Sequence, residues 1–216
     1  MADFIFPFLI LIFSVVIHEV AHGSVAYALG DPTAQKLGRL TLNPIPHLDP
    51  FGSVILPLLQ LVSLQGVFFA WAKPVPFNPY NLRNQRWGPV LVGLAGPLSN
   101  LLVALVFGLF FRFYILSDIG VGGVLGETSA FASILFLIVF INLSLAIFNL
   151  LPIPPLDGSH LFLSLLPYQW YNVRYQIEKY GFVVLVAILL LLPNVISRII
   201  SPAIAFLVRL ITGLAL

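Results

Sequence analysis

Long runs of apolar residues alternate along this 216-residue chain with short segments that carry most of its charge. Three runs, at residues 4–29, 90–111 and 131–151, reach the length of about 20 residues that a helix needs to cross a bilayer. Two more apolar segments, 180–192 and 195–214, are separated by a proline and are expected to form a helical hairpin. The pattern predicts an all-α polytopic membrane protein with about five to six transmembrane helices.

A further apolar segment, residues 51–71, contains a proline and several polar residues. A full span here would place the basic residues of 36–39 and of 73–86 on opposite sides of the membrane, against the usual excess of basic residues in cytoplasmic loops. A re-entrant segment keeps them on one side, and broken segments at membrane depth are tolerated where they line a protein cavity. We therefore favour one cytoplasmic module, residues 31–88, that dips into the membrane at 51–71, while a full span stays open as the alternative.

The composition excludes several classes of protein. Hydrophobic residues make up 60% of the chain and charged residues 8%, which is too little polar surface for a soluble domain of this length. The net charge of +2 comes with no dense basic patch, so nothing indicates nucleic-acid binding. Because cysteine is absent, histidine and carboxylate side chains are the available metal ligands. No basic residue precedes the first apolar run, which argues against a cleaved signal peptide there.

The first apolar run contains the motif His18-Glu19-Val20-Ala21-His22. Residues four apart lie on one face of a helix, so His18 and His22 can bind one zinc ion while Glu19 reaches a water molecule at the metal. Ionisable residues inside a membrane segment are costly and are read by default as functional. The alternative is a pair of structural histidines that hydrogen-bond to neighbouring helices.

A second motif, residues 149–158, follows the third predicted span and supplies Asp157. If 51–71 is re-entrant, the first and third spans run parallel, so Asp157 can approach the two histidines as a third metal ligand. The prolines of this motif interrupt helical hydrogen bonding, and its glycine permits a turn toward the bundle. A similar stretch, residues 44–49, makes Asp49 a rival ligand, which we rank second because Asp49 precedes an apolar segment and does not end a helix.

The two motifs resemble the signatures of the site-2 proteases, zinc metalloproteases that cut substrates within the membrane. Residues 95–100, Ala-Gly-Pro-Leu-Ser-Asn, are similar to the small-residue motif of that family's central core helix. The resemblance implies one Zn²⁺ per chain, held by His18, His22 and Asp157, with Glu19 as the general base.

The resemblance also implies a domain organisation and a location. Residues 1–216 are expected to be a single membrane-embedded metalloprotease domain, with a catalytic core at about 4–158 and additional C-terminal helices at 170–216. It is similar to minimal bacterial and archaeal forms, without an appended PDZ or nucleotide-binding regulatory domain. The expected place is the plasma membrane of a prokaryote, with the active site toward the cytoplasm.

Substrate contacts are expected near residues 39–43, whose alternating side chains predict a short β-strand near the cytoplasmic side. Such a strand could pair with an extended substrate through Leu40, Thr41 and Leu42, and a structural hairpin edge is the equal alternative. His47 is a candidate gate or temporary zinc ligand, or else a loop histidine satisfied by backbone or water.

Two asparagines complete the candidate site. Asn149 is expected to contact the substrate or the oxyanion, with a buried interhelical hydrogen bond as the alternative. Asn100 is grouped with the residues that bind substrate or gate its access. His160 receives no role from the sequence.

The predicted function is intramembrane proteolysis, the zinc-dependent hydrolysis of peptide bonds in or near transmembrane segments. The expected partners are a transmembrane substrate and the lipid bilayer, with no nucleic acid, and homo-oligomerisation is left open. The alternative function is a non-catalytic zinc-binding scaffold or a protein that binds client helices. Glu19 argues against this alternative, because neither role needs a carboxylate between the two histidines.

Overall fold

The computed structural model describes residues 2–55, 72–120 and 130–214, and the chain is helical over most of these ranges. The α-helices are α1 (Ala2–Ala28), α2 (Thr33–Lys36), α4 (Gly88–Gly120), α5 (Ala130–Asn149), α6 (Gly158–Leu165), α7 (Tyr171–Leu191) and α8 (Pro193–Thr212). Shorter helical turns are η1 (Ile45–His47), η2 (Pro50–Ile55), η3 (Pro79–Asn81) and η4 (Tyr168–Trp170).

Among the described residues, four helical segments are long and apolar enough to cross a membrane: Ile5–Ala28, Gly88–Ile115, Ala130–Asn149 and Asn194–Thr212. They confirm the predicted helical membrane fold in outline. The expected hairpin of 180–192 and 195–214 is present as α7 and α8, but α7 is not among the four. Helix α7 already begins at Tyr171, and its first half carries charged side chains. The expected dip at 51–71 lies largely outside the described residues, apart from its first turn in η2.

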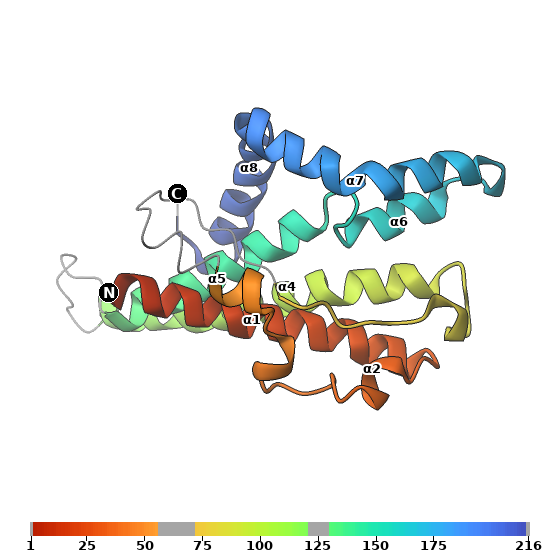
Figure 1. The fold of residues 1–216 in the computed structure, drawn as a ribbon. Coiled ribbons are helices and arrows are strands. Elements are labelled where there is room, and N and C mark those ends of the chain that lie inside the picture. The colour runs from red at the N-terminus through yellow and green to blue at the C-terminus, as the bar shows by residue number, and fades with distance from the viewer. Residues whose placement is uncertain (1, 56–71, 121–129, 215–216) are drawn as a thin grey trace.

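The helices α1, α4 and α5 lie side by side at the centre of the molecule (Figure 1). Helix α4 runs antiparallel to α1, because Val92 lies beside His22 while Asn100 lies beside Ser14. Asn142 of α5 also contacts Ser14, and the chain beyond α5 then reaches the two histidines of α1. This is the parallel arrangement expected for the first and third spans.

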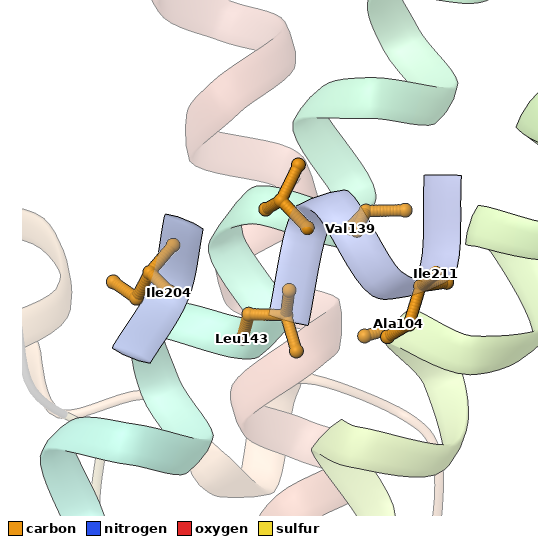
Figure 2. Packing of buried hydrophobic residues seen from close by; sticks show 6 residues of the cluster. Ala104, Val139, Leu143, Ile204 and Ile211 are labelled. Carbon is orange, nitrogen blue, oxygen red and sulfur yellow. The ribbon is translucent and has the colours of Figure 1, made fainter. Parts of the chain in front are cut away.

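Helix α8 packs across α4 and α5 through a buried apolar cluster (Figure 2). The cluster contains Ala104, Val139, Leu143, Ile204, Val208 and Ile211. Gly108 of α4 faces Ile211, and a Cβ at Gly108 would overlap that side chain. Because glycine has no Cβ, α4 and α8 can approach closely, as small residues allow between membrane helices.

Residues 72–78, called the strap below, run extended alongside α1 (Figure 1). Two hydrogen bonds mark where the strap and the residues after it meet the end of α1. Asn78 donates its backbone N–H to Asp31, and Arg83 donates its backbone N–H to the carbonyl oxygen of Leu29. The strap therefore follows α1 past the two histidines.

The short strand predicted at residues 39–43 is wrong, because this segment forms bends in the structure. Local hydrogen bonds replace a strand ladder here: Thr41 Oγ accepts from the backbone of Asn43, and Asn43 Oδ1 accepts from the backbone of Ile45. Within the described ranges, the extended pairing is limited to one isolated antiparallel bridge between Leu48 and Ala72.

Candidate metal centre

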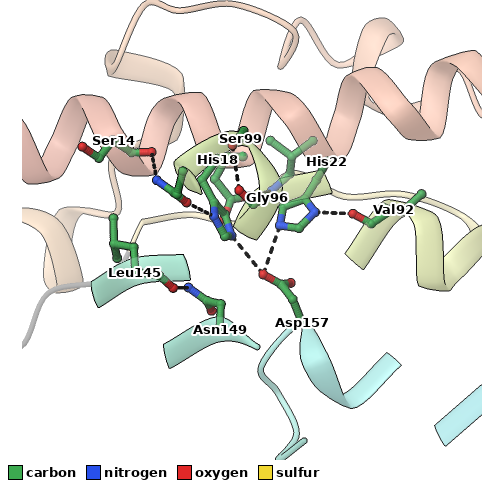
Figure 3. A network of polar contacts seen from close by, with 12 residues as sticks. Ser14, His18, His22, Val92, Gly96, Ser99, Leu145, Asn149 and Asp157 are labelled. Atoms are coloured by element: carbon green, nitrogen blue, oxygen red, sulfur yellow. Dashed lines mark hydrogen bonds and ion pairs between the residues drawn. The ribbon is translucent and has the colours of Figure 1, made fainter. Parts of the chain in front are cut away.

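His18 and His22 lie one turn apart on α1, and their rings turn toward the same point (Figure 3). Both are buried, with 6% and 8% of their surface exposed. The Nε2 atom of His18 is 3.0 Å from Oδ2 of Asp157, and the Nε2 atom of His22 is 3.3 Å from the same oxygen. The helical spacing of the motif therefore brings two imidazoles and one carboxylate together.

The other ring nitrogen of each histidine faces an oxygen acceptor. His22 Nδ1 is 2.6 Å from the carbonyl oxygen of Val92, and His18 Nδ1 is 2.5 Å from Oδ1 of Asn100. The Asn100 amide has a defined orientation, because its Nδ2 donates to the carbonyl oxygen of Ser14 and to Oδ1 of Asn142. Both Nδ1 atoms therefore carry a hydrogen, which leaves both Nε2 atoms able to bind a metal.

Positive charge is needed where these groups meet. Two Nε2 lone pairs and a carboxylate oxygen are all acceptors, so they approach closely only around additional protons or a metal cation. The three candidate ligand atoms lie within 4.8 Å of one another. The two nitrogen to oxygen separations are near the ~3.4 Å edge of a tetrahedron whose ligands lie ~2.1 Å from zinc. His18, His22 and Asp157 therefore fit a zinc site of the catalytic type, which has three protein ligands and one open position.

Asp157 is presented to the histidines by the turn between α5 and α6. Burial disfavours its charged form, but hydrogen bonds and charges from His18 and His22, when their Nε2 atoms carry protons in place of a metal, outweigh this effect and lower the pKa of Asp157 to about 2. Gly158 makes the turn possible, because a Cβ there would overlap the backbone of Leu150. The glycine of the second motif is thus required by close approach of the backbone, and Asp157 is ionised at neutral pH.

Asp49, the rival ligand, lies elsewhere in the structure. Its Oδ1 accepts hydrogen bonds from the backbone N–H groups of Phe51 and Gly52, at 3.0 and 2.7 Å. This is the position of an aspartate that caps the first turn of a helix, here η2. The structure therefore brings Asp157, and not Asp49, to the histidines.

Gly96 of α4 packs directly against the histidine pair. A Cβ at this position would overlap Nε2 of His22 and would lie 2.5 Å from Nε2 of His18. In the sequence, residues 95–100 stood out only as a small-residue motif similar to that of a core helix. In the structure its glycine keeps open the space beside both candidate nitrogen ligands.

We expect Gly96→Ala to lower zinc affinity by about 10–100-fold, because the added methyl group displaces both imidazoles from their positions. Zinc content after equilibration with a competing chelator measures the effect. Gly108→Ala is the matched control: it is the same change in the same helix, but it meets Ile211, so it should lower thermal stability and leave zinc content unchanged. Unaltered zinc affinity in Gly96→Ala would contradict the placement of the metal.

Glu19 lies on α1 between the two histidines and is half-buried. Its Oε2 accepts a hydrogen bond of 2.7 Å from the backbone N–H of Val75 in the strap. No donor from the described part of the chain reaches its other oxygen, Oε1. One carboxylate oxygen is therefore held by the protein, and the second is available for another partner.

A buried hydrogen-bond network lies behind His18 and joins three helices. Ser14 of α1, Asn100 of α4 and Asn142 of α5 are almost completely buried, and Asn142 donates to Oγ of Ser14 at 2.9 Å. Asn100 is fully buried and contacts Nδ1 of His18, and its grouping with the substrate-binding residues stays a prediction. Ser14 and Asn142 were not among the residues predicted from the sequence. Their signal was the presence of isolated polar side chains inside apolar spans.

The remaining candidates contact neighbouring parts of the chain. Asn149 donates from Nδ2 to the carbonyl oxygen of Leu145 at 3.0 Å, within its own helix and not to a neighbouring helix, and its expected contact with the substrate or the oxyanion stays a prediction. His47 is fully buried, and its Nε2 is 2.9 Å from the carbonyl oxygen of Thr41, a contact of the kind expected for a loop histidine. Leu40 is half-buried and Leu42 is exposed, both on the bent segment described above.

His160, which had no assigned role, lies on α6. Its ring makes an edge contact with Phe77 beyond the middle of the strap, with 6.3 Å between ring centroids. Burial is the main cause that lowers the pKa of His160, which favours its neutral form at neutral pH.

Comparison with known proteins gives consistent matches. The family model described as Peptidase family M50 matches residues 115–192, a range that includes Asp157. A protein of Bacillus subtilis (strain 168), named "Putative zinc metalloprotease YwhC", is 41% identical over 180 residues, which cover 82% of this chain and 78% of the relative.

Two mycobacterial relatives match over a smaller share of their own length. A Mycolicibacterium smegmatis protein named "Putative zinc metalloprotease Rip2" is 29% identical over 178 residues, which are 82% of this chain and 63% of that protein. A Mycobacterium tuberculosis protein of the same name is 33% identical over 145 residues, which are 67% of this chain and 51% of that protein. No solved structure matches the chain significantly.

Proposed function

Because the chain belongs to peptidase family M50, the site-2 protease family, we propose that it is a zinc-dependent endopeptidase that cuts membrane proteins in or near their transmembrane segments. The observation that carries this proposal is the convergence of His18, His22 and Asp157 inside a bundle of membrane-capable helices. Glu19, between the two histidines, adds the carboxylate that a zinc hydrolase needs and a non-catalytic zinc-binding scaffold does not.

Each residue then has a defined task. His18, His22 and Asp157 would hold one zinc ion, which supplies Lewis-acid chemistry and makes water a better nucleophile near neutral pH. Glu19 accepts the proton of the attacking water and returns it to the nitrogen of the leaving amine. Asn100 and the carbonyl of Val92 orient the two imidazoles through their Nδ1 hydrogens. Asn149 keeps its second amide N–H and its Oδ1 for a substrate contact while Nδ2 donates to Leu145.

The position of the site along α1 supports cleavage near one membrane face. His22 lies six residues before the end of the apolar segment at Ala28, which corresponds to about 9 Å along the helix axis. Water can reach this depth more readily than the centre of the bilayer, which is the driest part of the membrane. We assign this end of α1 to the cytoplasmic side, because basic residues cluster in the adjoining segments 36–39 and 73–86.

The direct test is cleavage of a labelled peptide with a single transmembrane helix by the purified protein in liposomes. We expect cleavage that stops after treatment with a zinc chelator and returns when zinc is added, because the chelator removes the metal and leaves its protein ligands in place. A soluble peptide without an apolar segment serves as the control substrate and should be cut more slowly. Tight zinc binding without cleavage across a panel of transmembrane peptides would favour the non-catalytic scaffold instead.

A further inference from the structure

We propose that the strap is a positioning element for the catalytic base, in which the backbone N–H of Val75 holds Oε2 of Glu19 and leaves Oε1 for the attacking water. This inference rests on the proposed function, in which Glu19 is the base. The contact itself is a 2.7 Å hydrogen bond between residues 56 positions apart in the chain. A carboxylate on a helix surface can rotate, so a fixed donor on one oxygen selects its orientation.

The sequence of the strap explains why Val75 supplies this donor. Proline has no backbone N–H, and both neighbours of Val75 are prolines, Pro74 and Pro76. A shift of the strap by one residue in either direction would place a proline nitrogen opposite Glu19, and no hydrogen bond could form. The alternation of proline and valine therefore makes one alignment of the strap on α1 better than its neighbours.

Hydrogen bonds before Val75 keep this alignment. Lys73 donates its backbone N–H to the carbonyl oxygen of His47 at 2.8 Å. The guanidinium of Arg39, which is buried, donates from Nη2 to the carbonyl oxygens of Lys73 and Pro74 at 2.7 and 3.3 Å. Residues 73–78 belong to no helix or strand, so their carbonyl groups need other donors. Arg39 supplies donors to two of them.

Contacts at Val75 and after it complete the attachment. The Val75 side chain is buried and packs over Gly23, where a Cβ would lie 2.9 Å from Cγ1 of Val75. Asn78 donates its backbone N–H to Oδ2 of Asp31 at 2.6 Å. Burial opposes the charge of Asp31, but hydrogen bonds from Thr33, Asn81 and Asn78 outweigh it and lower the pKa of Asp31. The strap is therefore fixed on both sides of the residue that reaches Glu19.

Amide hydrogen exchange tests the contact without reference to activity. The amide of Val75 should be protected in the unmodified chain, as observed by NMR of a sample labelled with ¹⁵N-valine and assigned by loss of one signal in Val75→Ala. Glu19→Ala removes the acceptor and should raise exchange at Val75 by at least ~10-fold. Glu19→Gln, which keeps an oxygen acceptor, should preserve the protection. Equal protection in Glu19→Ala would overturn the proposal.

Enzyme kinetics test whether the contact positions the base. Val75→Pro deletes the N–H and should lower kcat by about 100-fold, the cost of misplacing a catalytic group, with KM and zinc content unchanged. Val75→Ala keeps the N–H but loses the packing over Gly23, so its rate should fall less than that of Val75→Pro. A faster reaction in Val75→Pro, or equal rates in the two variants, would contradict positioning. Lack of cleavage by the zinc-loaded unmodified chain would count against the proposed function, while the exchange experiment would still decide the strap contact.

Discussion

Replacing Glu19 with glutamine should remove peptidase activity while zinc remains bound. The amide cannot accept the proton of the attacking water, and general-base catalysis contributes about 10²–10⁴-fold to such reactions. Glutamine has nearly the same shape and still offers an oxygen to the N–H of Val75, so the strap and the helix should be unchanged. The three candidate ligands are untouched by this change. Cleavage of a transmembrane peptide and zinc content should be measured on the same preparation.

Glu178→Gln is the matched control for this experiment. Glu178 is exposed on α7 and pairs with Arg174 one turn away at 3.0 Å, a contact of small energetic value at a surface. Its replacement by glutamine should leave both activity and zinc content as they are. If Glu19→Gln cleaved as fast as Glu178→Gln, Glu19 would not be the base, and the hydrolytic mechanism assigned to the chain would have to be abandoned.

Replacing Asp157 with alanine should empty the zinc site to a much larger extent than replacing Asp49. Asp157 contributes one of three converging ligand atoms. Its replacement should therefore lower zinc affinity by more than the ~10–100-fold that follows when a residue hydrogen-bonded to a metal ligand is lost. Asp49→Ala removes the cap of η2 and should cost about 1 kcal/mol of stability with zinc retained.

Zinc-edge X-ray absorption reports both the occupancy and the ligand types of the two variants. With Asp157 as a ligand, the unmodified chain and Asp49→Ala should give the same spectrum, with two nitrogen ligands from histidine. A lower occupancy in Asp49→Ala than in Asp157→Ala would reverse the assignment. The parallel packing of α1 and α5 would then no longer account for the metal site.

The parts of the site that the sequence predicts are those set by local geometry. His18 and His22 follow from helical spacing alone, and Asp157 follows from a proline-rich stretch after a span whose direction the charge pattern indicates. The family signatures of these residues add specificity to both inferences. Short-range rules were sufficient to find each motif, because each motif spans no more than about ten residues.

Long-range contacts outside the two motifs could not be read from the sequence. Asn142 meets Ser14 across 128 positions, and Val75 meets Glu19 across 56, so neither pairing leaves a local pattern. The strand expected at 39–43 failed for a related reason. Its polar side chains bond to nearby backbone groups, and that competition is invisible to an alternation of polar and apolar residues.

The hydrogen bonds among Ser14, Asn100 and Asn142 also bear on biosynthesis. Helix α1 is made before α4 and enters the membrane with Ser14 and His18, although Asn100, the partner of His18, follows 82 residues later. Unpaired polar groups are costly in hydrocarbon. The polar side chains of α1 and α4 lack some of their hydrogen-bond partners until translation delivers α5 with Asn142. Asp157 emerges later still. A nascent chain therefore holds no complete metal site until three helices have come together.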